Sequence, residues 1–181
     1  KSVERLALLG GAYKRRVEID VGDRGALLEN LQQMHVHYTN AYEKNLVLHG
    51  TVYSYPLINA LAARWLLHKT NPEGNNLEDF DALLTSARQA NMQPEVNQEY
   101  FWEAIALTDC NLLEALKMNS LTAEKADHIA GAYEKLSRVA SSPRQMRSVV
   151  EHVGFLSSVT IQLKLPEAEH LEGMRNRLKK M

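Results

Sequence analysis

The sequence has few of the residues that hold small folds together by cross-links. Its 181 residues include a single cysteine, Cys110, which cannot form an internal disulfide. This excludes a disulfide-stapled secreted scaffold and favours a reducing compartment. No apolar run reaches the roughly 18 residues of a membrane-spanning helix. Lys and Arg (21) nearly balance Asp and Glu (22), so the charge gives no reason to expect binding to nucleic acid or to an anionic membrane.

The chain also lacks the features of targeting segments and of disordered sequences. Its first residues, KSVERLALLGGAYKRR, contain neither the apolar core nor the small-residue cleavage site of a signal peptide, and they do not begin with Met. With 45% apolar and 24% charged residues, the composition is that of one ordinary globular domain. We therefore expect a cytoplasmic domain that is a piece of a longer protein.

The pattern of apolar residues predicts helices and gives little sign of strands. Apolar residues recur at intervals of three and four along almost the whole chain, which is the spacing of an amphipathic helix. Segments such as NPEGNN at 71–76 and NMQPEVN at 91–97 mark the breaks. We expect an all-α fold of about seven or eight helices, in which short loops make successive helices pair as antiparallel hairpins.

The first helical segment carries the signature of a tetratricopeptide repeat. That signature places a large apolar residue, a leucine, a small residue and an aromatic residue along one helix as W-x2-L-G-x2-Y. The matching residues here are Leu6, Leu9, Gly10 and Tyr13. Tyr38 and Ala41 fit the pattern of the second helix, although they follow at a longer interval than in a standard repeat of about 34 residues.

A second, partial match lies in the middle of the chain. Trp102, Ile105 and Ala106 occupy the first three positions of the signature, whereas Asp109 replaces the aromatic residue. The two matches predict a degenerate, right-handed array of stacked tetratricopeptide-like hairpins. The alternative is an irregular helical bundle in which Gly10 only marks a close contact between two helices.

The end of the chain departs from the helical pattern. The segment VTIQLKL at 159–165 is rich in β-formers, but a lone strand would have no partner, so we expect a linker or a helix end there. The residues after Pro166 have few apolar positions to bury. We therefore predict a tetratricopeptide-like helical domain over 1–160, followed by a linker and a C-terminal connector helix over 161–181 that contributes little to the core.

Five segments carry a resemblance to a known family: LALLGGAYKRR, HYTNAYEKN, YSYPLINALAARWLL, YFWEAIALTDCNLLEAL and AYEKLSRVASSPRQMRSVVEHVGFL. Together they resemble the tetratricopeptide-like TRAFs-binding domain of MAP3K-type kinases, in the form found in bacterial multidomain proteins. The resemblance covers about 4–156. It implies a non-enzymatic protein-interaction or regulatory module of a larger bacterial signalling protein, which binds a protein partner or adjacent domains of its own chain. No TRAF-docking residue matches a motif, so TRAF binding does not follow.

Signatures of catalysis and of metal binding are sparse. His35 and His37 are two apart, so on a helix they point about 200° away from each other and cannot share a metal ion. A di-iron bundle needs two Glu-x-x-His pairs and two more glutamates, and only Glu167 and His170 fit. Cys110 is expected to be a small core residue. Without a phosphate-binding loop, a Rossmann glycine pattern or H-E-x-x-H, we expect no catalytic residue, metal or cofactor; the alternative is a helical-bundle enzyme or metal-binding protein with an unrecognised site.

Two groups of residues are the candidates for binding a partner. Tyr53 and Tyr55, together with Tyr38 and Tyr42 on the preceding predicted helix, combine apolar area with a polar group. Stacked hairpins leave a surface on which such side chains are available. The alternative is that these tyrosines belong to the core. Arg138, Arg144 and Arg147 lie where the end of one predicted helix meets the start of the next, and they suit an acidic or phosphate-bearing partner; a solvated helix face explains most such groups.

Overall fold

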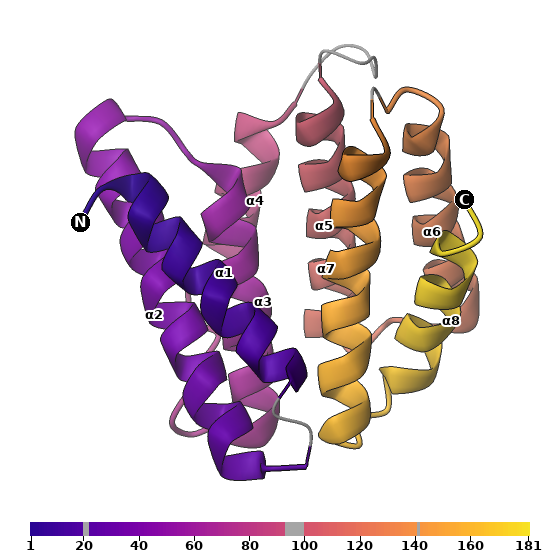
Figure 1. Ribbon diagram of the computed structural model, residues 1–181, viewed down its shortest axis with the longest axis horizontal. Helices are drawn as coiled ribbons and strands as arrows, with labels where there is room; N and C mark the ends of the chain where they lie inside the picture. The colour runs from indigo at the N-terminus through magenta and orange to yellow at the C-terminus, as the bar shows by residue number, and fades with distance from the viewer. Residues whose placement is uncertain (20–21, 93–99, 141) are drawn as a thin grey trace. The chain divides into compact units, whose positions relative to one another are not determined.

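The computed structural model describes residues 1–19, 22–92, 100–140 and 142–181. Within them the chain forms α-helices and no strand, and successive helices pack pairwise. The predicted all-α class is thereby confirmed (Figure 1). The eight helices of the described residues are α1 (Val3–Ile19), α2 (Arg24–His49), α3 (Ser54–Thr70), α4 (Phe80–Ala90), α5 (Phe101–Lys117), α6 (Ala123–Ser137), α7 (Pro143–Gln162) and α8 (Ala168–Leu178).

The chain divides into two compact units, an N-terminal unit (Lys1–Ala90) with α1 to α4 and a C-terminal unit (Asn91–Met181) with α5 to α8. The boundary at 160/161 that the sequence suggested lies within the C-terminal unit and stays a prediction. Most of the predicted connection NMQPEVN lies outside the described residues, as do 20–21 and 141.

The N-terminal unit is built on the α1–α2 pair, which has the most extensive contact of any two helices described. Helix α2 begins where the Asp23 carboxylate accepts a hydrogen bond from the Ala26 N–H at 3.0 Å, which satisfies a donor that the first turn would leave unpaired. It ends at Gly50, whose φ of 65° is left-handed and is therefore suited to glycine. These two ends fix the length of the helix that carries Tyr38 into the core.

Gly10 allows α1 and α2 to approach closely. A Cβ atom at Gly10 would lie 2.8 Å from the ring of Tyr38, closer than carbon atoms pack, and Tyr38 is fully buried. Among the other residues matching the repeat signature, Leu6 and Ala41 are buried, whereas Leu9 and Tyr13 are only half-buried. The glycine is thus a contact between helices, as a tetratricopeptide-type hairpin requires.

The partial match in α5 packs differently. Ile105 and Ala106 are buried, but Trp102 is 52% exposed. The Asp109 carboxylate accepts a hydrogen bond from the Tyr133 hydroxyl of α6 at 2.5 Å, and both residues are buried. Where the repeat signature has an aromatic ring, α5 therefore has a buried carboxylate that joins it to α6.

Helix α8 is buried more fully than its composition suggested. It packs against α6 and α7, and its apolar residues Leu171, Met174 and Leu178 are all buried. The reason is their spacing of three and four, which places all of them on one face of a short helix. Helix α7 extends to Gln162, so VTIQLKL contains a helix end rather than a strand. This packing leads us to expect that α8 contributes to the stability of the C-terminal unit.

Candidate functional site

Two exposed tyrosines flank the start of α3 in the N-terminal unit. Tyr53 is the residue before the helix, and Tyr55 lies in its first turn. Their rings are 6.4 Å apart with an interplanar angle of 41°, and they remain 39% and 52% exposed. Because Pro56, Leu57 and the following residues are buried, the start of α3 is held against the core while the two rings lie at the surface. We call Tyr53, Tyr55 and the Tyr38 side chain beneath them the tyrosine surface.

Tyr38 connects this surface to the core. Its hydroxyl oxygen lies 3.2 Å from that of Tyr55, and the two rings meet edge to face at 5.8 Å. Burial raises the pKa of Tyr38 far above its usual range and also raises the pKa of Tyr53. Both phenols therefore stay neutral at physiological pH, and the surface offers hydroxyl groups and apolar area rather than charge.

Basic and amide groups of α1 and α3 border the tyrosine surface. The Lys14 ammonium donates a hydrogen bond to Asn59 Oδ1 at 2.8 Å, and Asn59 Nδ2 donates to the carbonyl of Tyr55 at 2.8 Å. Arg15 is exposed, and its positive charge favours the ionised form of Tyr38, against the larger effect of burial on that pKa. One edge of the surface is therefore positively charged.

The last turn of α2 adds exposed apolar residues shortly before the tyrosines. Leu46, Val47 and Leu48 are 40%, 85% and 58% exposed. Their exposure was not predicted above, although the sequence contains the signal for it. A helix packed on one side buries only one stripe of its surface, so three consecutive apolar residues cannot all be buried.

The three candidate arginines lie in the C-terminal unit, apart in sequence from the tyrosine surface. Arg138 follows the last residue of α6, whereas Arg144 and Arg147 lie in the first two turns of α7. All three are exposed. A positive charge at the end of α6 complements its helix dipole, which gives Arg138 a structural role as well. Their role in binding stays a prediction.

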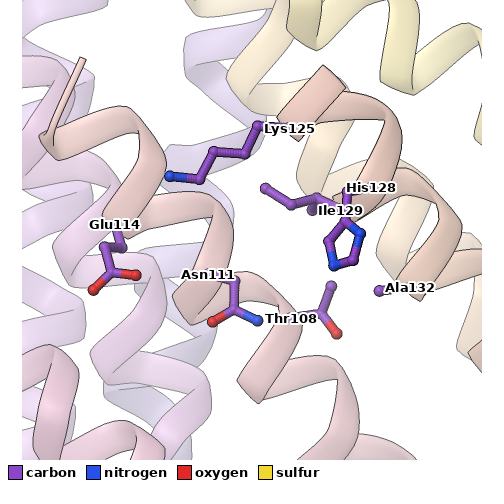
Figure 2. Close-up of a pocket in the computed structure, with 7 residues that line it drawn as sticks. All are labelled: Thr108, Asn111, Glu114, Lys125, His128, Ile129 and Ala132. Carbon is purple, nitrogen blue, oxygen red and sulfur yellow. The ribbon is translucent and has the colours of Figure 1, made fainter. Parts of the chain in front are cut away.

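A groove of about 230 Å³ lies between α5 and α6. Figure 2 shows Asn111 and Thr108 on α5 across from His128 on α6, with Lys125 one turn before the histidine. The Thr108 hydroxyl donates to the carbonyl of Ala104 at 3.0 Å, and the Lys125 ammonium donates to Ser120 Oγ at 3.0 Å. Both of these donors are therefore already engaged within the protein.

The histidines and the cysteine do not converge. His35 Nδ1 lies 3.2 Å from the carbonyl oxygen of Ala60 on α3, while His37 stacks on Tyr13 of α1 at 5.4 Å. Cys110 is buried. Among residues 1–19, 22–92, 100–140 and 142–181, no three His, Cys, Asp or Glu residues are grouped closely enough to hold a metal ion. In that same part of the chain, no helix is both long and apolar enough to cross a membrane.

Comparison with known proteins identifies the N-terminal region. Residues 1–64 match the family model described as TPR-S, Tetratricopeptide Repeats-Sensor. No curated protein and no solved structure matches the chain. The matched residues cover α1, α2 and the first part of α3, and so they include the whole tyrosine surface. The chain thus contains a tetratricopeptide-like helical domain, and the resemblance is confirmed at that level but not for the TRAFs-binding domain of MAP3K-type kinases in particular.

Proposed function

We propose that this tetratricopeptide-like chain is a non-enzymatic interaction module that binds a protein partner through the tyrosine surface. The observation that carries the proposal is the pair of exposed rings at the start of α3, anchored from below by the Tyr38 hydroxyl at 3.2 Å. Tyrosines held in place lose little side-chain freedom on binding, and residues of this type dominate the energetics of protein interfaces.

The position of the rings within the family match supports the same proposal. The match is to a sensor type of tetratricopeptide repeat, and repeat hairpins bind ligands with side chains that are not used for packing. Leu46, Val47 and Leu48, which precede the tyrosines in the sequence, are further exposed apolar residues. Exposed apolar area is typical of interaction sites when it is contiguous.

The wider setting is also a proposal. A regulatory module within a larger bacterial signalling protein, located in the cytoplasm, agrees with the resemblance to regulatory tetratricopeptide-like domains and with the single cysteine. The partner is then another protein or an adjacent domain of the same chain. Sequencing the full-length gene tests the proposal of a larger signalling protein, because it shows which domains are encoded beside this module.

The binding proposal is tested by selecting peptides from a random phage-displayed library on the purified chain. The affinities of the selected peptides are then measured for Tyr53→Ala, Tyr55→Ala and the control Trp102→Ala. Trp102 suits this purpose because it is an aromatic residue with the same 52% exposure as Tyr55. We expect the tyrosine variants to bind about tenfold or more weakly, as at interface hot spots, and the control to bind normally.

Thermal melting of each variant separates lost binding from lost folding. Peptides that bind the tyrosine variants and the native chain equally well would show that the module binds elsewhere. In that case the exposed arginines of the C-terminal unit, Arg138, Arg144 and Arg147, are the next surface to change.

A further inference from the structure

We propose that the Tyr55 hydroxyl and the Arg15 guanidinium together bind a carboxylate in an acidic peptide segment of the protein partner. This rests on the proposed function, because it assigns a ligand group to the tyrosine surface. Three features carry the inference: the direction of one hydrogen bond, the position of Arg15 beside the Tyr38 hydroxyl and the charge along α1.

The burial of Tyr38 sets the direction of the hydrogen bond between the two phenols. Tyr38 is fully buried, and its oxygen lies 3.2 Å from that of Tyr55. If Tyr55 donated this bond, the Tyr38 proton would lose its acceptor inside the protein, which is costly. Tyr38 therefore donates and Tyr55 accepts. The proton of the half-exposed Tyr55 is then available to a ligand, and accepting one bond strengthens a hydroxyl as a donor of the next.

The second donor, Arg15, lies one helical turn beyond Gly11. A Cβ atom at Gly11 would lie 3.4 Å from the Tyr38 hydroxyl oxygen and 3.9 Å from Arg15 Nη1. The Tyr38 hydroxyl, to which Tyr55 is hydrogen-bonded, and the Arg15 guanidinium thus both lie near one point of α1, so Tyr55 and Arg15 flank the same buried hydroxyl. The two oxygens of a carboxylate can accept hydrogen bonds from two such donors, and bonds between charged groups are the stronger kind.

The charge along α1 selects an acidic ligand. Lys14 and Arg16 flank Arg15 in the sequence, so three basic residues outnumber the carboxylate of Glu18 in this part of α1, and a net positive charge attracts negatively charged groups. The Tyr53 ring, 6.4 Å from that of Tyr55, provides apolar area for a neighbouring side chain of the same peptide. We therefore infer that the recognised segment has Glu or Asp close to an aromatic or aliphatic residue.

The test uses two peptide libraries on the full chain. One consists of acetylated, amidated octapeptides with one Phe and one Glu at all pairs of positions in an Ala/Ser background, and the other replaces Glu with Gln. Dissociation constants are measured by fluorescence anisotropy for the peptides that bind most tightly. We expect the Glu peptides to bind about tenfold more tightly than their Gln counterparts, with a preference that declines as salt concentration rises.

Three variants locate the carboxylate. Tyr55→Phe and Arg15→Gln should lose the preference for Glu, whereas Tyr53→Phe, which removes a hydroxyl from the neighbouring ring, should keep it. Arg15 is exposed, so its variant remains informative even if Tyr55→Phe folds less stably.

Equal binding of Glu and Gln peptides would overturn the carboxylate site while leaving the interaction surface in place, provided that Tyr53→Ala still weakens both. A preference for Glu that survives in Arg15→Gln, or the failure of every peptide in both libraries, would overturn the carboxylate site as well. The binding proposal itself fails only if peptides selected from the random library are indifferent to the tyrosines.

Discussion

Each of the two units has a buried tyrosine whose hydroxyl is hydrogen-bonded, but the two hydroxyls have different kinds of partner. In the N-terminal unit the Tyr38 ring packs on Gly10, and its hydroxyl bonds to the half-exposed Tyr55. In the C-terminal unit the Tyr133 hydroxyl donates to the buried carboxylate of Asp109. One hydroxyl thus connects the core to the surface, whereas the other is bonded to another buried group. The first arrangement leaves a polar group for a ligand, and the second joins two helices.

The largest expected effect comes from removing α8, which tests how the C-terminal unit is stabilised. Ending the chain after Pro166 removes Leu171, Met174 and Leu178, and burial of each contributes roughly 1.5–3 kcal/mol in a unit where all three are buried. We expect a large loss of stability in urea unfolding. A chain that ends after Leu178 is the matched control, because it loses only exposed residues. If the chain that ends after Pro166 unfolds cooperatively at the same urea concentration as the native chain, the prediction that residues 161–181 contribute little to the core would be supported.

The second-largest effect is expected when the buried tyrosine hydroxyls of the two units are removed one at a time. Tyr133→Phe removes a donor from a buried carboxylate and should cost about 1.5–3 kcal/mol, because hydrogen bonds to charged groups are the stronger class. Tyr38→Phe removes a bond to a half-exposed hydroxyl that water can satisfy, so about 0.5–1.5 kcal/mol is expected. Urea unfolding of both variants measures the difference. If Tyr38→Phe proved the more destabilising, the contrast between a surface-linked and a buried phenol would be wrong.

Gly10 tests the close contact on which the N-terminal unit depends. Leucine at this position would press on the Tyr38 ring, which lies 2.8 Å from the position of a Cβ atom, and overpacking of this kind costs about 1–3 kcal/mol. The exposed residue Arg16 serves as the control, and Arg16→Ala should cost under about 0.5 kcal/mol. Similar melting temperatures for the two variants would remove the argument for a tetratricopeptide-type contact.

The sequence predicted what depends on neighbouring residues along one helix. Helical spacing identified the all-α class, and Gly10 was recognised as a contact because it lies within a repeat signature. The repeat signature places Trp102 on the same packing face as Ile105 and Ala106, yet Trp102 is 52% exposed. It lies at the edge of the apolar stripe, and whether an edge is covered depends on helices that are distant in the sequence.

The candidate site, too, could be predicted from the sequence only in part. Tyr53 and Tyr55 were singled out from the sequence as amphipathic residues near a helix start. Tyr38 was grouped with them from the sequence, but its hydrogen bond to Tyr55 and the burial of its hydroxyl are properties of the folded unit. The sequence shows which residue types suit an interaction site. Which of two hydroxyls donates a hydrogen bond can be inferred only from their burial in the folded unit.

The smallest expected effect concerns the ion pairs between α8 and α6. The Arg177 guanidinium donates to both carboxylate oxygens of Glu134 at 2.5 Å and also pairs with Asp127. The hydrogen bond from Arg177 holds the pKa of the Glu134 carboxyl below its ordinary value of 4.5. A lowered pKa means that the pair stabilises the fold above about pH 4.5 and that this contribution is lost as the pH falls through the lowered pKa.

Glu134→Gln should therefore be slightly less stable than the native chain at neutral pH and equal to it in acid. Because Glu134 and Arg177 are only partly buried, the difference should also shrink at high salt. Urea unfolding at neutral and acidic pH measures it, with Glu124→Gln on the exposed first turn of α6 as the control. A difference between Glu134→Gln and the native chain that persisted unchanged in acid would show that the glutamine disturbs packing, and that α8 is held by its buried apolar face alone.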